Sequence, residues 1–160
     1  MQKKPIMLRL VLVLFTMVLF SSCASNTLEN PNLQAPIDPT KAEVVGSKIA
    51  GDGGIPYQIY ASFVDGTQLR HVAVDQTLKI WPIEPGAHNF RVEFAGSTGK
   101  IFLHPYTAEG QIMAELKAAH RYVVKIRPSG KGKIIFYFED TSDGREIATS
   151  DPVQLVDVEF

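Results

Sequence analysis

The sequence predicts an all-β fold, a small antiparallel β-sandwich of about seven to eight strands in residues 42–160. Apolar residues in this region alternate with polar ones, so that one face of each extended segment is apolar. Short sequences containing Gly, Pro, Asp or Ser separate the alternating runs, as turns between strands do. A hydrophobic content of 45% is sufficient for one packed interior.

The first clear strand lies between residues 58 and 63. Ile59, Ala61 and Phe63 alternate with Gln, Tyr and Ser, and we expect these three apolar side chains to share the inward face. Asp65 and Gly66 follow directly and are the residue types that a tight turn requires.

Later strands follow the same pattern. Residues 89–94 alternate polar and apolar side chains most clearly. Residues 121–127 alternate as well, with Arg121 among the polar positions, and a Pro-Ser-Gly-Lys-Gly turn leads from them into 134–138. These two runs predict an antiparallel hairpin. Further candidate strands are 78–83, 100–103 and 152–160.

The segment 111–119 fits two kinds of secondary structure. It is rich in helix-forming residues, and Ile112, Leu116 and Ala119 recur at helical spacing. Ile112, Ala114 and Leu116 also fit one face of a strand, and the context of a sheet often overrides local propensity. We expect a strand, because short sequences on either side of this segment resemble those of a known group in which a strand lies between them.

Residues 1–22 have the organisation of a signal peptide. Three basic and no acidic residues occur in the first nine, an apolar run covers 10–20, and Ser21 and Ser22 follow. This run is well below the roughly 20 residues that span a bilayer, so we do not expect a transmembrane anchor.

Residues 19–23, Leu-Phe-Ser-Ser-Cys, resemble the lipobox of bacterial lipoproteins, with Phe20 where Leu is usual. The resemblance implies that the leader is cut before Cys23 and that the Cys23 thiol carries a diacylglycerol, so that Cys23 is the lipid attachment site and the mature N-terminus. Ala24, rather than Asp, implies an outer-membrane location facing the periplasm. The alternative is an ordinary secretory signal that is cut nearby.

Residues 23–41 form the second part of the predicted organisation, a lipidated N-terminus and flexible linker. This stretch contains three prolines and three asparagines and has no regular apolar period. Such a sequence buries too little surface to offset the entropy of ordering, so we expect it to tether the sandwich domain just off the membrane surface.

Four short sequences occur at the turns and strand ends of the predicted sandwich: Val-Asp-Gly at 64–66, Ile-Glu-Pro-Gly-Ala-His at 83–88, Ala-Ala-His-Arg-Tyr at 118–122, and Phe-Tyr-Phe-Glu-Asp at 136–140 followed by Gly144. In their order they resemble a group of small proteobacterial outer-membrane lipoproteins of unassigned function, and the first hairpin is similar to the PEGA-type β module. Ala119 stands where that group usually has Gly. The resemblance implies a strand at 111–117 and assigns no activity.

The histidines are the main candidates for a metal site. Their separations of 17, 16 and 16 residues give no ligand pair of the usual spacing, so we expect no metal site. For His88 and His120, which follow turns at strand starts, we expect a hydrogen bond from the ring to a nearby carbonyl instead. The acidic set near residue 140 lacks the spacing of a calcium loop and fits a solvated turn. The histidines are His71, His88, His104 and His120, and the acidic set is Glu139, Asp140, Asp143 and Glu146.

Composition and motifs limit the function classes. All 17 acidic residues follow the leader, which holds three of the 16 basic residues, so the mature part is mildly acidic and we expect no nucleic-acid partner. The single cysteine excludes an internal disulfide and a multi-thiolate zinc site. No catalytic or cofactor motif occurs, so we expect neither an enzyme nor a cofactor.

We therefore expect a membrane-tethered periplasmic lipoprotein with a structural or interaction role in the bacterial envelope. Its partners would be the membrane, through the lipid anchor, and an envelope protein or polysaccharide. The alternative is a periplasmic domain that binds a small ligand or metal through its histidines, and a hydrolase is a third hypothesis with less support.

Overall fold

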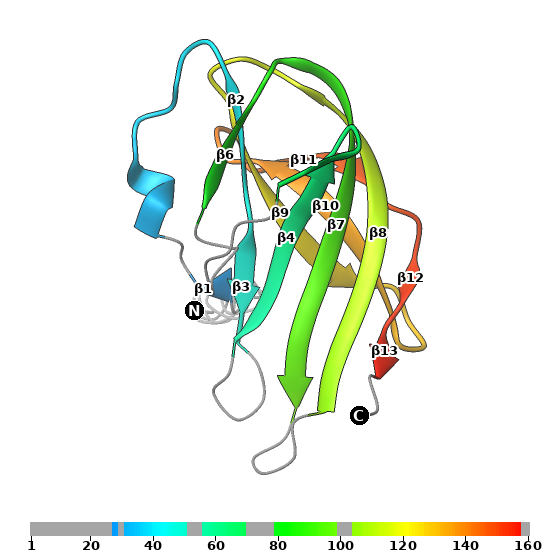
Figure 1. Ribbon diagram of the computed structural model, residues 1–160. Coiled ribbons are helices and arrows are strands. Elements are labelled where there is room, and N and C mark those ends of the chain that lie inside the picture. The colour runs from blue at the N-terminus through cyan, green and yellow to red at the C-terminus, as the bar shows by residue number, and fades with distance from the viewer. Residues whose placement is uncertain (1–26, 29–30, 51–55, 70–78, 99–103, 158–160) are drawn as a thin grey trace, which may run out of the picture.

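The computed structural model describes residues 27–28, 31–50, 56–69, 79–98 and 104–157 (Figure 1). In these residues the fold is all-β, as predicted, and two sheets pack face to face as a sandwich. The only helical turn among them is a 3₁₀ turn, η1 (Pro31–Gln34). No helix in the described ranges is long and apolar enough to cross a membrane.

The larger sheet has seven strands, and its central pair contains the longest strands among the described residues. β7 and β8 pair antiparallel in unbroken register from Gly86 opposite Leu116 to Thr98 opposite His104. Residues 111–116 lie in β8, which confirms the strand and rejects the helix. The strands are β1 (Thr27–Leu28), β3 (Ser47–Ile49), β4 (Tyr57–Val64), β5 (Thr67–Gln68), β7 (Gly86–Thr98), β8 (His104–Leu116) and β13 (Val156–Asp157), in the order β1-β3-β4-β7-β8-β13 with β5 on β4.

The second sheet has six strands, and its β9–β10 hairpin confirms the pairing predicted for 121–127 and 134–138. The candidate strands at 78–83 and 152–160 correspond to shorter strands, whereas 100–103 lie outside the described residues. The strands are β2 (Ala42–Val45), β6 (Ile80–Ile83), β9 (Arg121–Pro128), β10 (Lys133–Asp140), β11 (Arg145–Thr149) and β12 (Val153–Gln154), in the order β11-β10-β9-β2-β6 with β12 on β10.

Two expectations about the sheets are corrected. The strand number is higher than seven to eight, because β1, β2, β3, β5 and β11 were not recognised and the predicted strand at 152–160 is divided into β12 and β13. The sandwich is also not purely antiparallel, since β2 runs parallel to β9. A parallel pair requires a long connection, and here the chain visits the other sheet several times between the two strands.

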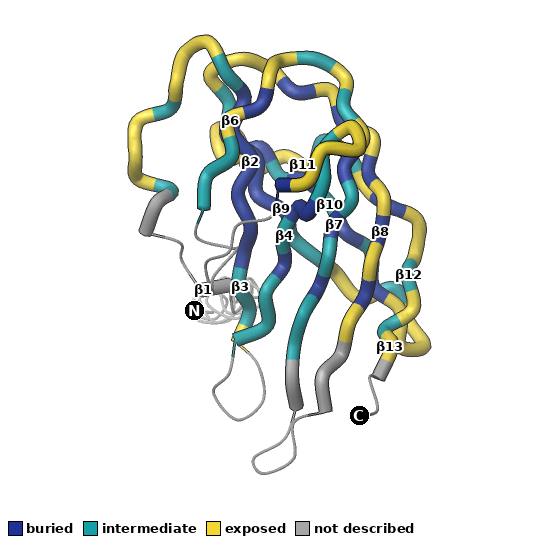
Figure 2. The backbone as a smooth tube through the Cα atoms, in the orientation of Figure 1, coloured by how far each residue is buried: buried dark blue, intermediate teal, exposed yellow. Residues whose placement is uncertain are grey.

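The core lies between the sheets and follows the predicted alternation in most strands (Figure 2). Phe90, Val92 and Phe94 of β7 are all buried, and the ring of Phe90 meets that of Phe138 edge to face at a centroid distance of 4.9 Å. Gly110 of β8 makes room for another core ring, that of Phe136, because a Cβ at position 110 would lie 2.8 Å from it.

Phe63 is an exception to the predicted alternation. A β-bulge between Ala61 and Phe63 shifts the register of β4 on β7, so Ala61 pairs with Val92 while Phe63 pairs with Arg91. Because a bulge adds one residue, it transfers the following side chain to the other face. Phe63 is therefore only half-buried. The guanidinium carbon of Arg91 lies over the Phe63 ring, 3.7 Å from the ring centroid.

Candidate functional site

The predicted lipid attachment site, Cys23, and the signal peptide at 1–22 lie outside the described residues. The structure nevertheless describes part of the segment that follows Cys23. Residues 27–28 form β1 and pair antiparallel with β3. Residues 27–28 belong to the predicted flexible linker, and this pairing attaches them to the sandwich.

A buried ion pair holds the next part of the predicted linker. The Arg121 side chain, 2% exposed, donates from Nε and Nη2 to the Glu43 carboxylate at 2.8 and 2.5 Å. Its Nη1 donates to the Leu33 carbonyl at 2.7 Å and its Nη2 to the Ala35 carbonyl at 3.0 Å. The amide of Asp38 donates to Glu43 as well. Arg121 thus joins β9, β2 and residues 33–38 in one network.

This network corrects two expectations. Arg121 was expected on the solvated face of its strand, but residues 33–38 cover that face and bury it. Residues 33–38 were expected in a free linker, but their backbone carbonyls and amide are bonded to the domain. Val123, two residues further along β9, is buried as well, so neither face of β9 is exposed at its start.

His120 and Asp140 extend this buried polar region. The Nδ1 atom of His120 lies 2.6 Å from Oδ2 of Asp140, whose side chain is 4% exposed. Burial alone would raise the pKa of Asp140, but hydrogen bonds from the hydroxyl and amide of Ser142 and from His120 lower that pKa below its ordinary value. Asp140 is therefore an ionised acceptor at the turn after β10.

His88 occupies a more exposed polar cluster at the start of β7. Its Nδ1 lies 2.6 Å from Asp65 Oδ2 and its Nε2 lies 2.7 Å from the Glu84 carbonyl, so both ring nitrogens face acceptors. Only the imidazolium donates from both nitrogens. Burial alone would lower the pKa of His88, but these two hydrogen bonds raise it above its ordinary value.

Asp65 is held in this cluster by the predicted turn. Its φ of 49° and the φ of 78° at Gly66 place both central turn residues in the left-handed region, as a type I′ hairpin requires. The pKa of Asp65 is lowered by the hydrogen bond from the Asn89 amide and by that with His88. The side chains of Asp65 and His88 therefore connect the turn at 65–66 with the start of β7 and with the loop before it.

The histidines do not converge on a metal in the part of the chain that the structure describes. His88 and His120 are each bonded to a different aspartate, and His88 also makes the expected hydrogen bond to a carbonyl, that of Glu84. His71 and the side chain of His104 lie outside the described set. Among the described side chains, no three His, Cys, Asp or Glu residues lie close enough to hold a metal ion.

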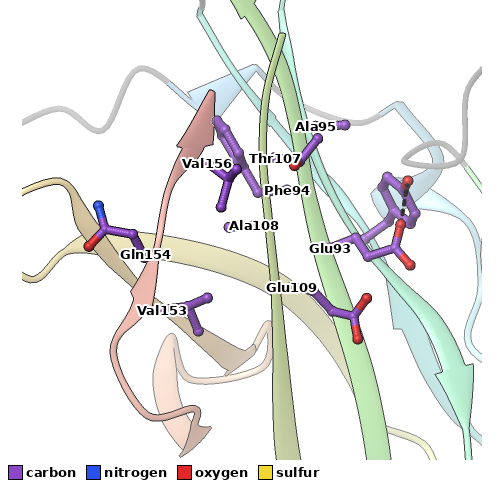
Figure 3. Close-up of a pocket in the computed structure, with 10 residues that line it drawn as sticks. Glu93, Phe94, Ala95, Thr107, Ala108, Glu109, Val153, Gln154 and Val156 are labelled. Carbon is purple, nitrogen blue, oxygen red and sulfur yellow. Dashed lines mark hydrogen bonds between the residues drawn. The ribbon is translucent and has the colours of Figure 1, made fainter. Parts of the chain in front are cut away.

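A shallow groove of about 530 Å³ runs from the outer face of β7 and β8 toward the C-terminal strands (Figure 3). Glu93 and Glu109 lie directly opposite each other in it. The Nε atom of Arg91 lies 3.9 Å from the Glu93 carboxylate and 3.7 Å from the Glu109 carboxylate. The Tyr60 hydroxyl donates to Glu93 at 3.0 Å. The two carboxylates are thus balanced by neighbouring groups of the protein itself.

No protein-family model matches the chain, and neither a curated protein nor a solved structure matches it. The residues and contacts of this molecule therefore carry the functional argument.

Sequence reasoning missed the Arg121–Glu43 pair, which fixes where the N-terminal segment lies. One signal was available, since Glu43 is the single charged residue in the short apolar run of β2. A charged side chain within a strand that is otherwise buried requires a partner of opposite charge. The sequence did not say which of the basic residues supplies that partner.

Proposed function

We propose that this chain is a lipid-anchored protein of the bacterial envelope with Cys23 as its acylated N-terminus. The observation that carries the proposal is the sequence Leu-Phe-Ser-Ser-Cys at 19–23, which follows a basic and then an apolar segment and contains the only cysteine. In this proposal the sandwich is held at the outer membrane, faces the periplasm, and acts in a structural or interaction role rather than as an enzyme.

The attachment of residues 27–28 and 33–38 to the domain supports this role. Since residues 27–28 already pair with β3, the free part of the tether runs from Cys23 to Thr27, four residues that reach at most about 13–14 Å when fully extended. Because Arg121 also binds the carbonyls of Leu33 and Ala35, the free part of the tether is shorter than a linker to residue 41 would be. The anchor therefore keeps the sandwich close to the membrane surface.

The polar groups of the described residues support a non-catalytic role. Glu43 and Arg121 are bonded to each other and to the backbone of residues 33–38, and Asp140 is bonded to His120 and Ser142. These hydrogen bonds stabilise the turns and the N-terminal segment, and they account for the buried charges without a substrate.

The proposal is tested by labelling growing cells with an alkyne analogue of palmitate. The wild-type chain is expected to incorporate the label and to lose residues 1–22, whereas Cys23→Ala incorporates none and retains the leader. Ser22→Ala is the matched control, because it keeps a small residue beside Cys23 and should be labelled normally. Equal labelling of the wild type and Cys23→Ala would overturn the proposal.

The location is tested by membrane fractionation. The wild type is expected in the outer-membrane fraction, and Ala24→Asp is expected to shift the chain to the inner membrane. A wild-type chain found in the soluble periplasmic fraction would contradict the anchor and the location together.

A further inference from the structure

Among the described residues, the outer edge of β8 is the longest strand edge without a hydrogen-bonded strand partner, although β11 and β12 of the second sheet pass near it. On one side β8 pairs with β7 over its whole length, and on the other side β13 covers only Tyr106 and Thr107. Residues 108–116 have no strand partner on that side in the described part of the chain. Alternate backbone N–H and C=O groups of such an edge can pair with an added strand.

Other edges of the sandwich carry features that discourage added strands. The β11 edge is five residues long, and a bulge at Ile147, opposite Phe138 and Glu139 of β10, disturbs its register. The β6 edge contains Pro82, which has no N–H to donate. Short strands, bulges and prolines are the usual means of protecting an edge, and no bulge interrupts β8 on β7.

The exposed side chains of β8 alternate with its buried ones and include a large apolar residue. Met113 is 79% exposed, and only Val156, in the adjacent β13, is a second exposed large hydrophobic in the described chain. Glu109 and Gln111 precede Met113 on the same face, and Glu115 and Lys117 follow it. Met113 thus lies at the centre of a short polar strip with an acid at one end and a base at the other.

We propose that two copies of this chain pair antiparallel along β8, with Met113 of one copy opposite Met113 of the other. In this register Glu109 lies opposite Lys117 of the second copy, twice by symmetry, and Gln111 lies opposite Glu115. The two exposed methionines cover each other. A register centred on Ile112 instead places Glu109 opposite Glu115, which is repulsive.

The inward face of β8 suits the same register. Gly110 would lie opposite Leu116, and Ile112 opposite Ala114, so that apolar residues continue the core face across the junction. The two-fold axis stands perpendicular to the sheet, so both N-terminal segments leave from the same side of the dimer. This inference rests on the interaction role proposed above and names a second copy of the chain as its partner; pairing itself does not require the lipid.

Disulfide trapping in isolated membranes tests the register with the full chain. Directly opposite residues of antiparallel strands are about 4.5–5.5 Å apart at Cα, which a disulfide spans. Met113→Cys is expected to form a covalent dimer under mild oxidation. Thr149→Cys, an exposed position on β11, is the matched control and should remain monomeric, as should the wild type with its single cysteine.

A charge exchange tests the same pairing without a crosslink. Each of the single variants Glu109→Lys and Lys117→Glu places two like charges opposite each other at both symmetric ends of the interface. Each should weaken dimerisation by roughly tenfold. Light scattering of the detergent-solubilised protein measures this change. The double variant Glu109→Lys/Lys117→Glu restores both pairs and should recover the wild-type dimer. Cooperative thermal unfolding of each variant verifies its fold.

The outcomes separate this inference from the anchor. A Met113→Cys chain that stays monomeric, or a double variant as weak as the single ones, overturns the β8 dimer even when palmitate labelling is normal. A trapped dimer in a chain without label supports the pairing and overturns the anchor.

Discussion

Two polar clusters join turns to strands in this molecule, and they differ in their exposure to water. The Arg121 cluster contains Glu43, His120, Arg121 and Asp140, of which Arg121 and Asp140 have side chains only 2% and 4% exposed. The His88 cluster contains His88 and Asp65, whose side chains are 14% and 52% exposed. Loss of one partner leaves a buried charge in the first cluster, whereas water can replace the partner in the second.

Removal of Arg121 should have the largest effect. Arg121→Met leaves the Glu43 carboxylate buried without its cation and is expected to lower the free energy of unfolding by about 3–5 kcal/mol. The measurement is urea denaturation followed by Trp81 fluorescence.

The double variant Glu43→Met/Arg121→Met is the control, since it removes both charges and should recover a substantial part of the loss. Limited proteolysis should also cut residues 33–38 faster in Arg121→Met. A single variant as stable as the wild type would show that the Arg121 cluster does not hold this segment.

Replacement of Asp140 should have the next largest effect. Asp140→Asn removes the ionised acceptor for His120 and Ser142 and is expected to cost about 1–3 kcal/mol of unfolding free energy at neutral pH. Because the folded pKa of Asp140 is lowered, its contribution is present above the unfolded pKa and is lost as the pH falls through the folded pKa. The difference from the wild type should therefore shrink in acid, and a difference independent of pH would contradict the assignment.

Ala119 offers a smaller effect of opposite sign. It has a φ of 62° in the turn before His120, a conformation that disfavours a Cβ. Ala119→Gly should relieve this strain and raise the free energy of unfolding by about 0.5–1 kcal/mol after the entropic cost of glycine in the unfolded chain. A lower thermal midpoint for Ala119→Gly would refute the expected strain.

The His88 cluster should respond least, and mainly to pH. The folded pKa of His88 is raised, so its contribution is complete below the unfolded pKa and is lost as the pH rises through the folded pKa. Wild-type stability should therefore fall relative to that of His88→Gln as the pH rises above about 6.5, the ordinary pKa of histidine. Parallel pH profiles for the two proteins would mean that His88 does not donate to both acceptors.

Local patterns predicted much of the fold. Asp65 and Gly66 make the expected turn with positive φ at both residues, and the β9–β10 hairpin forms where alternation and turn residues placed it. These features depend on neighbours in the sequence. Phe63 was assigned to the wrong face, because a bulge depends on the partner strand and has no certain mark in the sequence.

Features that depend on distant segments were not predictable. Glu43 and Arg121 are 78 residues apart, and their pairing follows from the parallel alignment of β2 with β9. Alternation alone placed Arg121 in solvent, because it gives no information about a segment that covers the outer face of a sheet. The position of Met113 on the outer face of β8 follows from alternation, whereas the unpaired edge of β8 over most of its length became apparent only from the order of the strands.

The most direct test of the central claim is the mass of the N-terminal peptide of the mature protein purified from its native membrane. The account predicts a peptide that begins at Cys23 and carries the mass of a thioether-linked diacylglycerol. A peptide that retains residues 1–22, or that contains Cys23 with a free thiol, would contradict it.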